Sequence, residues 1–223
     1  MAIQKVTSSL IADNSVGMAQ LNVTDGTNGQ LLKTNGSGTL SFVDAGGGGG
    51  AWNVISSQTI SSSVAYVTFT GLTGYANYKL VWNSVKHDSH PTWMWFEAST
   101  DGGSNWFTST NWKTTMLYGD SATTSLSVDN SWSNSSGKCS IIRNIHQHND
   151  YRKHAGEITF YSFNASDWTH FESKDIHDYF AGRSAFTQCF GTCMSETGFN
   201  AIRFGAGSNF DNGTFTLYGL ANS

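Results

Sequence analysis

Two histidines separated by one residue, His146 and His148, have the type and spacing of a metal site. In a strand both imidazoles would face the same side, because side chains alternate with period two. Three such pairs around a three-fold axis would offer an octahedral set of nitrogens, which suits a first-row transition ion. The polar stretch Asn149-Asp150-Tyr151 that follows is more typical of a solvated loop. We therefore predict no metal and no other cofactor, and keep His146 and His148 as the metal candidates.

A second kind of chemistry, the holding of a sugar, needs an exposed aromatic ring beside a few placed polar groups. Trp132 lies in a stretch rich in Ser and Asn, and Trp168 lies between Asp167 and Thr169-His170. These loop-like contexts predict ligand contacts at Trp132, Trp168, Asp167 and His170. For every tryptophan the alternative interpretation is packing in a core or a subunit interface. The other tryptophans with the same two interpretations are Trp93, Trp95, Trp106 and Trp112.

The acidic residues give no recognisable catalytic arrangement. Glycosidases need two carboxyl groups about 5 Å or 6.5–9.5 Å apart, and the sequence brings no two together. Asp175-x-x-Asp178 resembles a dyad, but a turn rich in polar groups explains it equally well. Neither a Gly-x-Ser-x-Gly elbow nor a His-Glu-x-x-His motif is present. We predict that the protein is not an enzyme and has no catalytic residues.

The composition indicates the elements that must position these residues. Charged residues make up only 13 % of the chain, aromatic residues also make up 13 %, and there are 24 Gly but 1 Pro. Helical surfaces normally carry many Lys, Glu and Arg, whereas strands favour aromatic and β-branched residues. The fold class predicted is therefore all-β.

Charge and hydropathy exclude several partners. The net charge of −4 offers no basic surface for nucleic acid. No apolar run reaches the length of about 18 residues that a membrane span requires. The N-terminus has no apolar region typical of a secretory signal. The 3 cysteines are an odd number, which argues against a disulfide framework and for synthesis in a reducing cytosol. We expect Cys189, in an apolar run, to be buried.

Many short segments of alternating polarity follow Trp52, with turn residues between them. In Trp93–Ala98 the two tryptophans alternate with Met94 and Phe96, so one of these two faces should be core. The terminal segment Thr214–Leu220 alternates cleanly and is expected to close the sheet. The other predicted strands are Val64–Phe69, Tyr78–Trp82, Trp106–Phe107, Ser125–Val128, Cys139–Ile145, Glu157–Phe163, His170–Ser173, Ala185–Phe190 and Ala201–Phe204. Such a pattern favours an antiparallel sandwich or barrel.

The N-terminal segment has a different character. Residues 24–44 contain the turn dipeptides Asp25-Gly26, Asn28-Gly29 and Asn35-Gly36, with few large apolar residues to form a core. Five consecutive glycines, Gly46–Gly50, follow and are typical of a flexible linker. We therefore predict three parts: a stalk over residues 1–45, a glycine hinge over 46–50 and a β-sandwich head over 51–223.

Residues 3–44 resemble the N-terminal parts of structural proteins of tailed phages, especially those that infect marine bacteria. The stretches that carry this resemblance are IQKVTSSLIADNSV and DGTNGQLLKTNGSGTLSFVD. The block from Trp52 to Leu220 resembles the globular head of such chains, through its Ala98–Trp106 hairpin and its terminal Phe215–Leu220 strand. The resemblance implies a homotrimeric fibre or spike with an eight-stranded, jelly-roll-like head. It leaves open whether the fibre sits on the tail or on the capsid.

These observations lead to one main expectation. Residues 1–45 would attach the trimer to other virion proteins, and the head would adsorb to a host-surface glycan or protein, with no nucleic acid and no membrane insertion. The chain would be made in the host cytoplasm and end in the virion. The alternatives are a capsid-decorating head fibre or cement protein without a specific ligand, and a polysaccharide-cleaving enzyme.

Overall fold

The chain forms two compact units, Met1–Gly49 and Gly50–Ser223. The structure, a computed structural model, describes residues 27, 30–37, 39–44, 52–89, 93–108, 112–122, 126–129, 137–143, 153–179, 183–195 and 198–220. The predicted hinge over residues 46–50 and most of the predicted stalk lie outside these residues.

The first unit contains one described antiparallel hairpin, β1 (Gln30–Thr34) and β2 (Leu40–Asp44). Its turn follows the predicted Asn35-Gly36 dipeptide: Gly36 has a φ of 78°, and the Asn35 side chain accepts the N–H groups of Ser37 and Thr39 at 2.8 and 3.1 Å. Leu31 is 60 % exposed. The hairpin therefore leaves Leu31 and Leu32 exposed and buries none of its described side chains fully, in line with the expectation that this segment forms no core of its own.

The second unit is a single antiparallel sheet of eleven strands, and the described residues contain no helix. Accordingly, none of the described residues belongs to a helix long and apolar enough to cross a membrane. The strands are β3 (Trp52–Ile60), β4 (Val64–Phe69), β5 (Tyr78–His87), β6 (Trp93–Ser99), β7 (Trp112–Asp120), β8 (Ser127–Asp129), β9 (Cys139–Arg143), β10 (His154–Tyr161), β11 (Thr169–Tyr179), β12 (Arg183–Cys193) and β13 (Ala201–Leu220). The all-β prediction is confirmed, with eleven strands in the head rather than the eight that the resemblance implies.

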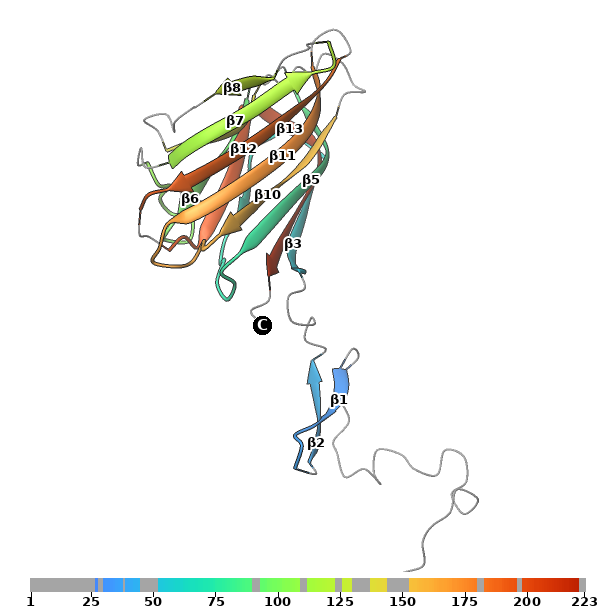
Figure 1. Cartoon of the computed structure of the whole chain (residues 1–223). Coiled ribbons are helices and arrows are strands. Elements are labelled where there is room, and N and C mark those ends of the chain that lie inside the picture. Colours follow the sequence, from blue (N-terminus) through green and yellow to red (C-terminus); the bar gives the residue numbers. More distant parts are fainter. Residues whose placement is uncertain are drawn as a thin grey trace, which may run out of the picture. The chain divides into compact units, whose positions relative to one another are not determined.

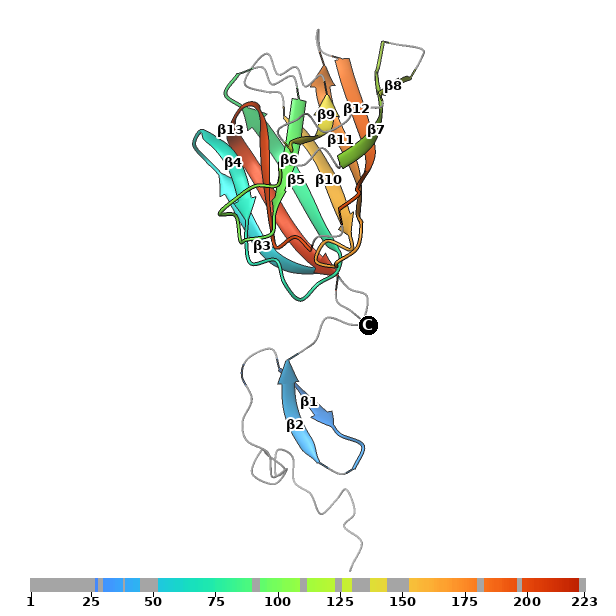
Figure 2. The ribbon, with the colours of Figure 1, turned by 90° about the vertical axis from the view of Figure 1, so that its left-hand side faces the viewer.

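One long strand, β13, joins the two halves of the sheet. Its first part pairs with β4 and β6, and its last part pairs with β3 and β5. Register shifts between Gly205 and Thr214 separate the two parts, and bulges of this kind bend a strand. The long layer is thus β8-β7-β12-β11-β10-β5 with the end of β13 and β3, and the short layer is β4, the start of β13, β6 and β9 (Figures 1 and 2). The expectation that Thr214–Leu220 closes the sheet is wrong, because this part of β13 pairs with β3 on one side and with β5 on the other.

The core lies between the two layers. Phe96 of β6 meets Trp112 of β7, Phe160 of β10 and Phe171 of β11, with ring centroids 4.9, 5.0 and 5.1 Å apart and nearly perpendicular planes. Edge-to-face pairs of this kind add to the hydrophobic gain from burial. Figure 2, turned by 90°, gives a second view of the sheet around this core. The sandwich prediction therefore has a physical basis in aromatic side chains that the two layers share.

Alternation placed most strands correctly. Val64–Phe69 coincides with β4, as predicted, and in Thr214–Leu220 the alternation puts Phe215 and Leu217 on the buried face. Met94 and Phe96 form the core face of β6. β3 and β7 were not predicted, and Trp106–Phe107 is not a strand, although the Phe107 N–H donates to the Ala98 carbonyl at 2.8 Å.

Candidate functional site

Three neighbouring strands of the long layer, β7, β12 and β11, present a mixed aromatic and polar outer face. In β12 the residues Ala185, Thr187 and Cys189 are buried. Phe186 and Phe190 alternate with them and therefore point outward. Phe190 is 44 % exposed. An exposed phenylalanine in the middle of a sheet face is a large apolar surface without a covering side chain, and such surfaces often mark binding sites.

The strand register brings polar side chains next to this ring. Thr192 pairs with His170 of β11 on one side and with Lys113 of β7 on the other. In the next outward row, Phe190 pairs with Glu172 and with Thr115. Cross-strand partners on one face lie about 4.5–5.5 Å apart. His170, Thr192 and Lys113 therefore form one row across the three strands, next to the row that contains Phe190.

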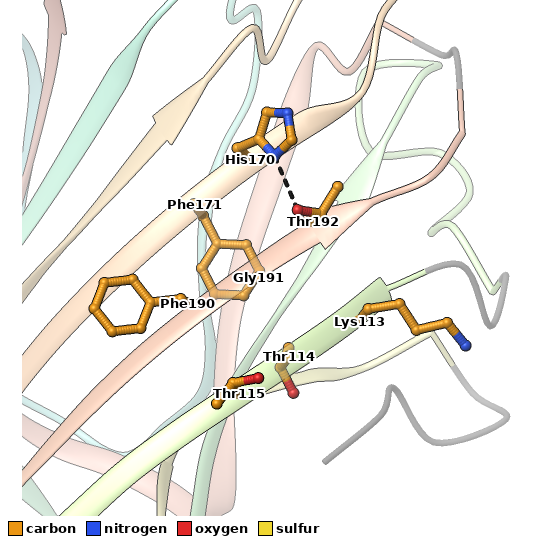
Figure 3. Close-up of a pocket in the computed structure, with 8 residues that line it drawn as sticks. All are labelled: Lys113, Thr114, Thr115, His170, Phe171, Phe190, Gly191 and Thr192. Atoms are coloured by element: carbon orange, nitrogen blue, oxygen red, sulfur yellow. Dashed lines mark hydrogen bonds between the residues drawn. The ribbon is translucent and has the colours of Figure 1, made fainter. Parts of the chain in front are cut away.

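These side chains line a hollow of about 420 Å³. Figure 3 shows the lining residues, which are Lys113, Thr114, Thr115, His170, Phe171, Phe190, Gly191 and Thr192.

Gly191 is required beneath this hollow because a Cβ there would lie 2.3 Å from the ring of Phe171. The glycine lets the Phe171 ring fill the space under the strand.

The hollow has the donors and acceptors that a sugar hydroxyl needs. His170 Nδ1 and Thr192 Oγ1 are 2.8 Å apart and hydrogen-bonded, which fixes the orientation of the imidazole. An aromatic ring can cover the apolar side of a sugar ring while hydroxyl, imidazole and ammonium groups meet its edge. None of the described residues that line the hollow is a carboxylate.

Of the predicted ligand residues, His170 alone lines this hollow. Trp168 is 44 % exposed, and Asp167 accepts the Trp168 N–H at 2.7 Å in the turn before β11. Trp168 and His170 flank the buried Thr169, but neither Trp168 nor Asp167 is a lining residue. Trp132, and the metal candidates His146 and His148, lie outside the described residues.

Sequence reasoning missed Phe190, Thr192 and Lys113. Phe190 was treated as part of an apolar strand, where a phenylalanine is normally buried. The small and polar residues at Ala185 and Thr187 could have revealed the opposite orientation, because they share a face with Cys189 and alternate with Phe186 and Phe190.

Asp175 and Asp178 form no dyad, and the interpretation of this segment as a polar turn is wrong. Both residues lie in β11, where an odd spacing puts them on opposite faces. Asp175 is 2 % exposed and points into the core. A carboxylate can be buried there because donors surround it, which is the usual condition for a buried charge.

Three side chains donate to the Asp175 carboxylate. Trp82 Nε1 and His154 Nδ1 donate to Oδ2 at 2.7 and 2.9 Å, and His177 Nδ1 donates to Oδ1 at 2.8 Å. Burial alone would raise the pKa of Asp175, but the attraction and hydrogen bonds of His154 and then His177 outweigh it and lower the pKa to about 2. The carboxylate stays ionised, with its donors already in place.

The network extends to a fourth side chain, His87. Its Nε2 lies 3.1 Å from Nε2 of His154, and the two rings stack with centroids 5.3 Å apart and planes 9° apart. Burial, followed by repulsion from His154, lowers the pKa of His87 to about 3. Because one proton is shared between the two Nε2 atoms, a second proton here would be strongly unfavourable.

The cysteines are also internal. Cys139, Cys189 and Cys193 are free and buried, as expected for Cys189, and burial raises the pKa of Cys189 to about 12. Within the described ranges, no group of three or more His, Cys, Asp or Glu side chains could hold a metal ion.

Comparison of the chain with family models, with curated proteins and with solved structures finds no match. The hollow on β7, β12 and β11 is therefore interpreted from its own residues.

Proposed function

We propose that this chain is a structural fibre protein of a tailed phage, assembled as a homotrimer, whose β head adsorbs to a glycan on the host surface. The observation that carries the binding role is the half-exposed Phe190 ring in a hollow with Lys113, His170 and Thr192. The resemblance of residues 3–44 to phage structural proteins supports the virion role, and the separate N-terminal unit is compatible with an attachment segment.

In this proposal a pyranose lies with its apolar side on Phe190. Its hydroxyls exchange hydrogen bonds with Thr192 and His170, and the Lys113 ammonium meets an oxygen at the rim. One such open site binds weakly. Three sites on one trimer, and several trimers on one particle, raise the avidity by about 10²–10⁴ without a tighter single site.

The test compares Phe190→Ala with Phe186→Ala in the full-length protein. Both residues point outward from β12, but only Phe190 lines the hollow. We expect the Phe190 variant to bind purified host envelope polysaccharide about five- to tenfold more weakly, since an aromatic contact contributes about 1 kcal/mol. The Phe186 variant should bind like the unaltered protein.

Equal binding by all three proteins would contradict the assignment of the hollow. Absence of binding to any host glycan, together with a location on the capsid surface, would favour the capsid-decorating alternative. Release of oligosaccharides from the polysaccharide would favour the enzyme alternative.

A further inference from the structure

The outer face of the short layer carries a second aromatic surface, on the side of the sandwich opposite the hollow. Tyr66 of β4, Gly205 of β13 and Trp95 of β6 lie in one row across the strands. A Cβ on Gly205 would lie 2.9 Å from Tyr66 Cε1 and 3.0 Å from Trp95 Nε1. The missing side chain thus lets the two rings approach each other and form one aromatic floor.

Trp93 extends this floor along β6. It lies two residues before Trp95 on the same face and is 42 % exposed. An exposed indole beside a buried one gives a flat apolar area large enough for one sugar ring. This area lies next to cations that contact the Tyr66 and Trp95 rings.

Among the described residues, three cations lie beside the floor, and they differ in their partners. Arg143 lies across from Trp93 in the register of β6 and β9 and is paired with Asp129. The Arg203 guanidinium lies 4.2 Å from the ring centroid of Tyr66 and 4.3 Å from that of Trp106, and it donates to Glu97 at 2.8 Å. The Lys138 ammonium lies 4.3 Å from the centroid of the Trp95 ring, and no described carboxylate pairs with it. Arg203 is therefore paired within the protein, whereas Lys138 has no carboxylate partner in the part of the chain that the structure describes.

The indole of Trp95 supplies a second, independent indication of a ligand. Its ring is 8 % exposed, and its Nε1 has no hydrogen-bond acceptor among the described residues. A buried N–H without a partner is destabilising and is rare in native proteins. This donor lies beside Gly205 and on the ring that Lys138 covers.

We propose that this surface, made by Tyr66, Trp93, Trp95, Lys138 and Gly205, is a subsite for an acidic sugar, a uronic acid or a sulfated residue. The inference rests on the proposed glycan-binding function and adds to it the charge of the ligand. The sugar ring stacks on Trp93. Its carboxylate or sulfate accepts from the Lys138 ammonium and, after a small shift of the covering side chains, from Trp95 Nε1. A strand of nucleic acid fits less well, because the chain carries a net charge of −4 and Arg203 is already paired.

The experiment measures binding of three probes to the full-length protein by calorimetry and tryptophan fluorescence. The probes are a galacturonate tetrasaccharide, a heparin-derived tetrasaccharide and a neutral glucose tetrasaccharide. We expect at least one acidic probe to bind more tightly than the neutral one, with an affinity that falls as NaCl rises from about 0.05 to about 0.5 M.

Two variants and two controls assign this binding. Lys138→Gln should weaken the acidic probe about fivefold or more at low salt and remove most of its salt dependence. Trp93→Ala should weaken it and abolish the fluorescence change. Lys153→Gln removes an exposed charge elsewhere, and Phe190→Ala alters the other site; both should bind the acidic probe like the unaltered protein.

The inference is overturned if neither acidic probe binds more tightly than the neutral one, or if Lys138→Gln binds like Lys153→Gln. Host polysaccharide binding that depends on Phe190 would then still support the proposed function. Loss of both kinds of binding would contradict both proposals. If a single-stranded oligonucleotide binds through Lys138 and the acidic sugars do not bind, the ligand of this surface is nucleic acid and not an acidic sugar.

Discussion

Replacement of His87 by Gln should remove much of the acid sensitivity of the head. In the folded protein the pKa of His87 is lowered to about 3 from an ordinary value of 6.5. Between these two values the unfolded chain binds one more proton than the folded chain, so the free energy of unfolding falls as the pH falls. From about pH 7 to about pH 5 this linkage removes about 2 kcal/mol of stability, and below about pH 3 it removes no more.

The surroundings of His87 explain why the proton is excluded. His154 stacks on one side and Phe210 lies with its ring centroid 5.0 Å away. Asp175 is the one carboxylate that raises the pKa of His87, together with backbone groups of Ser208 and Asn209, and burial outweighs all three. A glutamine at position 87 has no charge at any of these pH values and can still meet His154 with a polar group.

The assay is urea unfolding of three full-length proteins at several pH values between about 7 and about 5. The unaltered protein and the control His170→Gln, altered at the exposed histidine of the hollow, should lose about 2 kcal/mol more than His87→Gln over this range. The reasoning is refuted if His87→Gln loses stability as steeply as the unaltered protein, or if His170→Gln flattens the dependence as much.

Further outcomes follow from single contacts. Asp175 should add a second loss of stability at lower pH: its pKa is about 2 against an ordinary 3.8, so stability present above 3.8 is lost as the pH falls through 2 in an acid titration followed by circular dichroism. Gly191→Ala should lower the free energy of unfolding in urea by about 2 kcal/mol, because the new Cβ would lie 2.3 Å from the Phe171 ring. Trp168→Ala should change that free energy by less than about 0.5 kcal/mol, since the side chain is exposed. Cys189 should resist a thiol reagent in the native protein and react after unfolding, as labelling followed by mass spectrometry would show.

The sequence was sufficient for the class of fold and for the strands with a regular pattern. Val64–Phe69 alternates and ends at Gly71, which has a φ of 68°, and its strand has the predicted bounds. Longer strands were cut short where polar or glycine residues interrupt the pattern. β13 was predicted as two separate strands, because the glycines between Phe204 and Thr214 are typical of a turn. In the structure this stretch is a bend within one strand, which pairs with β3, β4, β5 and β6.

The candidate sites depend on pairing between distant strands, which one sequence does not specify. His170 was predicted, but its neighbours Lys113 and Thr192 join it through the registers of β7 with β12 and of β12 with β11. Asp175 was interpreted as a residue of a turn, because a carboxylate is not expected in a core without hydrogen-bond donors. Its donors Trp82 and His154 belong to other strands, so the sequence alone does not reveal them. At His170 and at Asp175 alike, contacts with distant strands determine the surroundings of the side chain.

The measurement that tests the central claim most directly is the mass of the full-length protein in solution by light scattering. The proposal of a multivalent fibre predicts a trimer of about 73 kDa, three times the 24.2 kDa of one chain. A mass of 24.2 kDa at all concentrations would contradict it, because a monomer has no multivalency and would leave a single weak binding head.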